Sequence, residues 1–257
     1  MNSSPLAGCT ALILAAGVGR RLGESHDGPK VLLEFGGRTL LERHLDNLIA
    51  NGVRRVVMTL GFEAETIEAA VAALDRRIET TFVRNPDFRR GSLVSLQVQR
   101  DLLRAGGDVV LMDGDVLCDA RMIARLGQGA AENTLLVDRQ IEPGDEPVKL
   151  CFRKDAEGRD VIVDFRKKPE HDHDWHGESV GFFRFSGATA AELSARCDDY
   201  VNAGRLDVEY EEAIRDLMLA APQRFGAVDV SDLPWTEIDF EEDVVRARTE
   251  ILPELAL

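Results

Sequence analysis

The sequence contains few cysteines, no long hydrophobic run and a deficit of positive charge. Its four cysteines are widely separated and form no Cys-x-x-Cys pair, so we expect free thiols in a reducing compartment and no zinc site. No apolar stretch approaches the ~20 residues that a transmembrane helix needs, which argues against a membrane protein. Lysine and arginine total 31 against 46 aspartates and glutamates, a net charge of −15. An acidic field repels phosphate backbones, so nucleic acid is not expected as a partner.

Other bulk features are those of an ordinary soluble globular protein. The first apolar run, residues 7–16, is short and has no basic segment before it, so we expect a core strand rather than a signal peptide, and a cytoplasmic location. The chain has 257 residues, of which 44% are hydrophobic and 30% charged, which is enough for one large α/β domain. Because the protein is acidic, an anionic substrate would have to be held by locally concentrated cations.

Hydrophobic periodicity predicts two parts of different character. In the first part, strands expected at residues 10–15, 54–60, 80–83 and 108–112 alternate with helices at 40–50, 64–74 and 92–103. This alternation predicts βαβ units and a mostly parallel sheet. From residue 133, strands at 134–137, 148–152, 161–165 and 179–185 lack long helices between them, and helices at 188–197, 209–219 and 241–249 follow, with a short strand at 236–239. We expect a single domain, residues 1–257, with a β-rich lid or subdomain at about 133–186.

A glycine-rich loop follows the first expected strand. Its residues run from Gly17 through Arg21 to Gly23, and Pro29-Lys30 comes one loop-length later. Glycines let backbone N–H groups face phosphate oxygens, and fixed cations neutralise the remaining charge. A P-loop would need Gly-Lys-Ser/Thr, and a dinucleotide fold would need its third glycine one residue earlier and an apolar helix after it. A glycine turn without a ligand would not explain the two flanking cations. The loop therefore indicates a triphosphate cradle.

The spacing Ala-Ala-Gly-x-Gly-x-Arg-Leu, followed by Pro-Lys, resembles the signature of nucleotidyltransferases that join a nucleoside triphosphate to a phosphorylated acceptor. The resemblance implies a Rossmann-like, three-layer α/β fold with a mostly parallel sheet. It also implies that Arg21 and Lys30 are catalytic. The nucleotide would be bound by the loop residues Ala15, Ala16, Gly17 and Gly19.

Two separated segments carry candidate metal ligands. Asp113-Gly114-Asp115 follows an apolar strand, and carboxylates at a strand end suit Mg²⁺, which prefers oxygen ligands. A solvated Asp-Gly turn is the simpler alternative. Trp235-Thr236-Glu237-Ile238-Asp239 resembles a late element of the cytidylyltransferases that activate phosphocholine and related phosphoalcohols. The resemblance implies that Asp115 and Asp239 bind Mg²⁺ and that Asp113 contacts the nucleotide. An N-cap for the next helix is the alternative for Asp239.

Further segments resemble the base-binding and phosphate-binding elements of the same enzymes. The stretch from Asn85-Pro86 to Ser92-Leu93 is similar to one that lines base and ribose, which implies nucleotide contacts for Asn85 and Ser92, although Gly91 replaces a second asparagine and Ser92 would also suit a helix cap. Lys168, in Phe165-Arg166-Lys167-Lys168-Pro169, matches a lysine that touches the reacting phosphates, although Lys167 replaces a glutamate. A solvated basic turn is the alternative there.

The acceptor is the least determined part. Lys149 is a candidate for the acceptor phosphate, and aromatic and acidic residues in the second half suit a cationic head group through cation–π and charge contacts, although aromatics are also common core residues. These are Trp175, Glu178, Tyr210, Glu211 and Trp235. The alternating histidines and aspartates of residues 170–176 fit no usual zinc spacing and predict an exposed loop.

The resemblance implies a Mg²⁺-dependent transfer from a nucleoside triphosphate, with CTP favoured, to a small phosphorylated alcohol, releasing pyrophosphate. Two alternatives remain open at this point: the same fold acting on a hexose 1-phosphate with UTP, GTP or dTTP, and a regulatory nucleotide-binding protein without catalysis. The expected partners are the triphosphate and the phosphorylated acceptor. A homodimer is left open.

Overall fold

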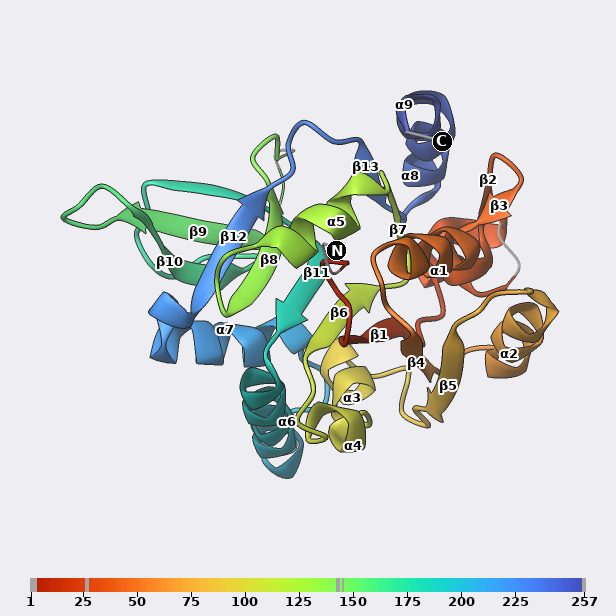
Figure 1. Ribbon diagram of the computed structural model, residues 1–257, viewed down its shortest axis with the longest axis horizontal. Helices are drawn as coiled ribbons and strands as arrows, with labels where there is room; N and C mark the ends of the chain where they lie inside the picture. Colours follow the sequence, from red (N-terminus) through yellow and green to blue (C-terminus); the bar gives the residue numbers. More distant parts are fainter. Residues whose placement is uncertain (1–3, 26–27, 142–143, 145, 256–257) are drawn as a thin grey trace.

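The computed structural model describes residues 4–25, 28–141, 144 and 146–255. Within these ranges the chain forms one nine-stranded sheet flanked by helices, with two small two-stranded sheets beside it (Figure 1). The central strand path is β10-β9-β11-β6-β1-β4-β5, and β8 joins it through β11 and pairs with β12. This is the α/β arrangement expected from the sequence.

The half of the sheet built around β1 is parallel. Strand β1 (Thr10–Ala15) pairs with β4 (Arg55–Leu60) on one side and with β6 (Val109–Asp113) on the other, and β5 (Glu79–Arg84) pairs with β4. Connecting helices are α1 (Leu40–Ala50), α2 (Ala64–Ala73), α3 (Ser92–Gln97) and α4 (Arg100–Leu103). The parallel register brings the carboxyl ends of β1 and β6 together, which is where ligands bind in such sheets.

The remaining strands extend the same sheet in antiparallel fashion. Strand β11 (Trp175–Phe185) pairs with β6 through its last residues and with β9 (Lys149–Lys154) through its first, and β8 (Asn133–Asp138) lies along it as well. Strand β10 (Asp160–Arg166) pairs with β9, and β12 (Phe225–Asp229) runs parallel to β8. The strands expected between residues 133 and 186 therefore continue the central sheet and form no separate layer. The division of the chain into domains stays a prediction.

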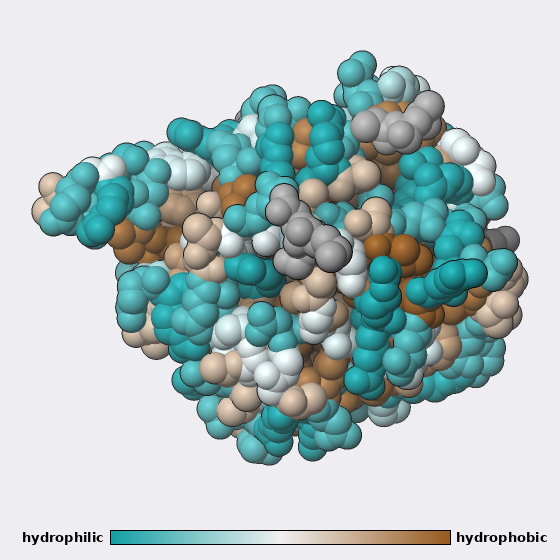
Figure 2. All heavy atoms as spheres, in the orientation of Figure 1, coloured by the Kyte–Doolittle hydropathy of each residue, from teal (hydrophilic) through white to brown (hydrophobic). Residues whose placement is uncertain are grey.

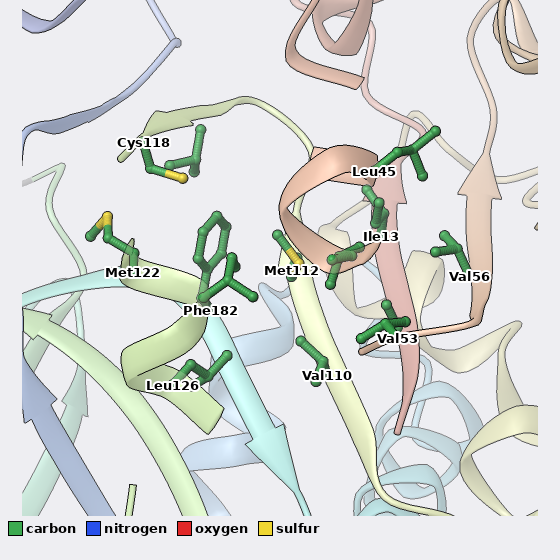
Figure 3. Close-up of a cluster of buried hydrophobic side chains, with 14 of the residues drawn as sticks. Ile13, Leu45, Val53, Val56, Val110, Met112, Cys118, Met122, Leu126 and Phe182 are labelled. Atoms are coloured by element: carbon green, nitrogen blue, oxygen red, sulfur yellow. The ribbon is translucent and has the colours of Figure 1, made fainter. Parts of the chain in front are cut away.

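Helices cover both faces of the sheet, because successive residues of each strand point to opposite sides. On one face, Ala11 and Ile13 of β1 belong to a buried cluster with α1, α2 and α5 (Arg121–Gln128). On the other, Leu12 packs with α3, α4, α6 (Gly187–Asn202) and α7 (Tyr210–Ala220). Figure 3 shows part of the first cluster, with Ile13, Met112 and Phe182 of three neighbouring strands among side chains of α1 and α5. Two helical layers around one sheet confirm the three-layer prediction.

A third, smaller core joins the C-terminal segment to the N-terminal half. Helix α8 (Glu241–Arg246), a π-helical turn (Ala247–Ile251) and α9 (Leu252–Glu254) pack over the hairpin of β2 (Glu34–Phe35) and β3 (Arg38–Thr39). Buried members of this core include Phe35, Leu117 and Ile238. Strand β13 (Trp235–Glu237) reaches the same region by pairing antiparallel with β7 (Val116–Cys118). The end of the chain is thereby brought next to the turn after β6.

Several expected elements differ from those observed. The helix expected at residues 92–103 is two helices, with Val98 and Gln99 between them, because the Gln99 side chain turns inward to donate to Thr59 Oγ1 at 2.8 Å. Helix α5 and strands β7 and β12 were not expected, and β11 begins four residues earlier than predicted. The helix expected at residues 241–249 changes to a π-helical turn after Arg246. The sequence Pro143-Gly144-Asp145 also predicts a turn, which falls largely outside the described residues.

A capping pair of side chains marks the start of helix α1. Thr39 accepts a hydrogen bond from the Glu42 backbone N–H, and the Glu42 carboxylate accepts one from the Thr39 backbone in return. This reciprocal pair satisfies two backbone donors that a helix start leaves free. It fixes the entry of the chain into α1, which follows the segment that carries Lys30.

A buried ion pair fastens α7 to β10. Arg215 Nε donates to Asp164 Oδ1 at 2.6 Å, and the other carboxylate oxygen of Asp164 accepts from the backbone N–H groups of Glu170 and His171. Asp164 is fully buried. Burial alone would raise its pKa, but these donors, with Arg215 first among them, hold the pKa of Asp164 below its ordinary value.

We expect Asp164→Ala to destabilise the protein by about 3–5 kcal/mol, because it leaves the Arg215 charge buried without its partner. Urea unfolding at pH 7 measures this. Since the folded-state pKa of Asp164 is depressed, its contribution is present above the unfolded value near ~4 and is lost as pH falls through the folded one. The difference between wild type and variant should therefore shrink on acidification. Asp199→Ala, which removes an exposed partner of Arg196, should leave the urea midpoint unchanged.

Among the described residues, no helix is long and apolar enough to cross a membrane. The face shown in Figure 2 is mainly hydrophilic, with hydrophobic residues scattered between polar ones, and the protruding β9–β10 end at the left carries a hydrophilic tip.

Candidate active site

A cleft of about 790 Å³ opens at the carboxyl ends of β1 and β6. The loop of residues 15–21 forms one wall, and the turn Asp113-Gly114-Asp115 forms the floor. The start of α7 and the end of β13 complete it. Seven of the residues expected to bind nucleotide or to act in catalysis at this end line the cleft: Ala15, Ala16, Gly17, Gly19, Arg21, Lys30 and Asp113.

Lys30 lies between the two aspartates predicted to bind metal. Its Nζ is 2.6 Å from Asp239 Oδ1 and 3.0 Å from Asp115 Oδ2, with only 14% of its side chain exposed. Burial would lower the pKa of the Lys30 ammonium, but the two carboxylates outweigh that effect and raise it. Lys30 is therefore a fixed cation at this point of the cleft. Residues 209 positions apart in sequence meet here because β13 pairs with β7 and the Ile238 N–H donates to the Asp115 carbonyl.

A third carboxylate completes this acidic cluster. Glu237 offers an oxygen that lies with those of Asp115 and Asp239 inside a group whose members are all within 4.8 Å of one another. Loss of bulk water in the cleft and the charges of Asp115 and Asp239 raise the pKa of Glu237 well above its ordinary value. Three neighbouring carboxylates repel one another, which favours a bound cation. Carboxylate oxygens are also the ligands that Mg²⁺ prefers. The residues present therefore fit such an ion.

Asp239 is not the N-cap of α8. The helix is capped at Phe240, and the Asp243 carboxylate accepts from the backbone N–H groups of Asp239 and Phe240 at 2.9 and 2.7 Å. The Asp239 side chain is free to face the cleft, where its Oδ2 is 2.8 Å from Arg21 Nη2. One carboxylate thus contacts both predicted catalytic cations.

Arg21 spans the entrance of the cleft. Besides Asp239, it contacts Glu146 Oε2 through Nη1 at 3.2 Å, and its guanidinium lies 4.9 Å from the centre of the Phe240 ring. The same Glu146 oxygen is 3.2 Å from Lys167 Nζ. Lys167 and Arg21 together lower the pKa of Glu146. An anion is therefore accommodated between these two cations.

Asp113 forms a buried pair with Tyr210 at the back of the cleft. The Tyr210 hydroxyl donates to Asp113 Oδ2 at 2.7 Å. Burial and the neighbouring Asp115 raise the pKa of Asp113 well above its ordinary value, and burial with Asp113 raises that of Tyr210. Gly181, with φ +77°, packs so close that a Cβ there would collide with the Asp113 carboxylate. A residue of β11 thus limits where this carboxylate lies.

The predicted base-binding segment is only partly in the cleft. Ser92 lines it and links two helix starts, since its Oγ donates to Glu209 Oε2 and accepts from the Tyr210 N–H, both at 2.9 Å. Asn85 is buried and does not line it: its side chain bonds Ser95 Oγ and the Asp87 N–H, so it shapes the turn after β5. Gly91 is explained by packing, because a Cβ would collide with the Val208 backbone.

Of the two lysines predicted to bind phosphate, neither lines the cleft. Lys168 is exposed beyond the end of β10, while its neighbour Lys167 lines the cleft, because consecutive residues of an extended segment point in opposite directions. Lys149 is held by the carbonyls of Gly144, Pro147 and Lys167, at 2.9, 3.4 and 3.1 Å, so it secures the wall instead. Lys167, and not Lys168, therefore has the position from which a lysine could contact a bound phosphate.

The predicted acceptor residues divide into two groups. Glu178, Tyr210, Glu211 and Trp235 line the cleft. Trp235 is buried and donates from Nε1 to Asp138 Oδ2 at 2.8 Å. Trp175 lies elsewhere, stacked on Phe152 at 4.1 Å, with Arg139 over its ring.

The histidines of residues 170–176 form no metal site in the described part of the chain. They make hydrogen bonds within their own region, as His171, His173 and His176 show. The acidic cluster is the one group of possible metal ligands found among the described residues.

The mostly parallel sheet, the glycine loop at its carboxyl edge and the added antiparallel strands define a Rossmann-like nucleotidyltransferase fold. The chain belongs to the MobA-like NTP transferase domain family, whose model matches residues 11–164. This confirms the resemblance read from the glycine loop.

Curated relatives and solved structures agree with this family. A CMP-5'-(3-aminopropyl)phosphonate synthase of Streptomyces rubellomurinus is 28% identical over 249 residues, covering 95% of this chain and 39% of that protein. A bifunctional IPC transferase and DIPP synthase of Rubrobacter xylanophilus is 27% identical over 241 residues, covering 92% and 50%. The chain thus spans half or less of these relatives. The inositol-1-phosphate CTP transferase from T. maritima superposes with a TM-score of 0.75 at 20% identity, covering 98% of this chain and 99% of that one.

Proposed function

We propose that the protein transfers a nucleotidyl group from a nucleoside triphosphate, with CTP preferred, to a small phosphorylated alcohol, and that it needs Mg²⁺. The observation that carries this proposal is the position of Lys30 among Asp115, Glu237 and Asp239, beside a glycine loop in one cleft. The preference for CTP rests on relatives named for CMP or CTP products and substrates. A cytoplasmic location and a homodimer stay predictions.

Each group in the cleft has a task in such a transfer. The acceptor phosphate is already anionic, so no general base is needed, and catalysis consists of positioning and charge neutralisation. Backbone N–H groups of the loop from Gly17 to Gly19 and the Arg21 guanidinium would bind the outer phosphates. Lys30 would neutralise charge at the α-phosphoryl group. Asp115, Glu237 and Asp239 would hold Mg²⁺, which neutralises and orients phosphate oxygens when bound. Lys167 takes the place proposed for Lys168.

We expect pyrophosphate release that requires Mg²⁺, a nucleoside triphosphate and a phosphorylated acceptor together. A coupled pyrophosphate assay with CTP, UTP, GTP and dTTP, each against a panel of phosphoalcohols and hexose 1-phosphates, measures it. The highest rate should be with CTP and a phosphoalcohol. A preference for a hexose 1-phosphate would support the alternative acceptor class, and nucleotide binding without pyrophosphate release from any pair would support a regulatory protein.

A further inference from the structure

One carboxylate oxygen that faces the cleft has no hydrogen-bond partner among the described residues. Glu211 projects from the first turn of α7 into the cleft, and its Oε2 atom is sealed from solvent without a hydrogen bond to any described residue. Its neighbour Glu209 differs, since its Oε2 accepts from the Ser92 hydroxyl. A buried acceptor without a donor costs free energy, which is recovered when a ligand supplies the donor.

The surroundings of Glu211 favour a positively charged donor. Burial and the nearby Glu209 and Glu237 carboxylates raise the pKa of Glu211 to about 8, and Lys167 offsets this only in part. Lys167 is itself engaged by Glu146 at 3.2 Å. Lys30 and Arg21, which also line the cleft, are paired with the acidic cluster. Among the charges that act on Glu211, the negative ones therefore predominate.

The aromatic residues of the cleft are not arranged as a cage for a quaternary ammonium group. Arg21 lies over the Phe240 ring at 4.9 Å, and Arg89 lies over the Phe88 ring at 4.6 Å. Tyr210 and Trp235 are buried and use their polar atoms to bond Asp113 and Asp138. The Phe240 and Phe88 rings are thus already faced by the protein's own arginines. A quaternary ammonium has no N–H and would leave Glu211 Oε2 unsatisfied.

We propose that the acceptor carries a primary ammonium group, which donates a hydrogen bond to Glu211 Oε2 while the phosphoryl end of the acceptor faces Lys30 and Lys167. This inference rests on the proposed function and names the class of acceptor that it takes: a short aminoalkyl phosphate or phosphonate. A zwitterion of this kind supplies both the N–H donor that Glu211 Oε2 lacks and an anion for the cations that line the cleft.

The test compares three acceptors with CTP: 2-aminoethyl phosphate, its trimethylated form phosphocholine, and 2-hydroxyethyl phosphate, in which an uncharged hydroxyl replaces the ammonium group. We expect kcat/KM for the primary amine to exceed that for the other two by about 10- to 100-fold, the effect of one charged hydrogen bond. In Glu211→Gln the preference should fall below about threefold, through a higher KM for the amine, with the KM for CTP and the melting temperature unchanged. Glu212→Gln, which alters the neighbouring carboxylate that pairs with Arg166 outside the cleft, should keep the preference.

The outcomes separate the two proposals. Equal use of all three acceptors, or a preference that survives Glu211→Gln, would overturn the ammonium site and leave the nucleotidyl transfer intact. If no acceptor supports turnover, titration calorimetry with 2-aminoethylphosphonate decides the inference by itself. Binding that weakens at least tenfold in Glu211→Gln but not in Glu212→Gln supports it, and absent or unaffected binding overturns it.

Discussion

Asp239→Ala is expected to lower kcat by about 10³-fold or more while the protein stays folded. The Asp239 carboxylate is the point where three functions meet: it contacts Lys30 Nζ at 2.6 Å and Arg21 Nη2 at 2.8 Å, and it belongs to the proposed Mg²⁺ ligand set. Its removal releases both cations from their present positions and deletes a metal ligand. Steady-state turnover at saturating CTP and Mg²⁺ measures the loss.

The melting temperature distinguishes a role of Asp239 in turnover from a role in holding the fold. The helix N-terminus nearby is satisfied by Asp243, so Asp239→Ala should leave the melting temperature close to that of the wild type. Asp115→Ala should behave in the same way. Asp232→Asn, an exposed carboxylate paired with Arg125, is the matched control and should keep full turnover. Near-normal turnover in Asp239→Ala would remove this residue from the site.

Lys30→Ala should lower turnover by about 10²–10³-fold, the usual effect of deleting one preorganised charge from a reacting centre. The same change should tighten binding of a divalent ion, because the ammonium now neutralises two of the carboxylates that would hold it. Mn²⁺ titration followed by electron paramagnetic resonance gives the affinity, and rapid quench gives the rate. The KM for CTP should change less than kcat.

A second lysine substitution, remote from the cleft, tests whether these effects are specific to Lys30. Lys154→Ala removes an exposed lysine that pairs with Asp160, and it should alter neither rate nor metal affinity. Weaker Mn²⁺ binding in Lys30→Ala would mean that Lys30 organises the carboxylates and does not compete for them.

Strong local signals made most of the fold predictable. The first strand, its glycine loop and α1 follow from a short apolar run, from turn chemistry and from the capping pair of Thr39 and Glu42. Elements that depend on distant partners were missed. Strand β7 has three residues and exists because β13, more than a hundred residues later, pairs with it. Strand β12 contains glycine and alanine, and it is a strand because it lies beside β8.

Residues of the candidate site could be predicted where they belong to a contiguous motif. They could not be predicted where either of two adjacent residues could face the cleft. The sequence predicted Asp115 and Asp239 as metal ligands, and the structure brings their carboxylates together with that of Glu237. Glu237 was not predicted, although alternation along an extended segment places it on the same side as Asp239. Lys167 was passed over for Lys168 because sequence similarity cannot tell which of two adjacent side chains faces a cleft. Asn85 carried a plausible motif, yet its amide is used to build a turn.

Strand β11 joins the parallel strands of the sheet to the antiparallel strands β9 and β10, whose sequences can vary more freely. Its final residues hold the register of β6, and through it the carboxylates after that strand, whereas its initial residues pair with β9. Strands β9 and β10 pair with neither β6 nor β1, so substitutions there need not shift the strands that carry the glycine loop and Asp115. Gly181 stands near the transition, where any side chain would strike Asp113. In a mutational library, tolerance should rise sharply on the β9 side of that glycine, so this wall of the cleft can vary while the parallel strands are kept.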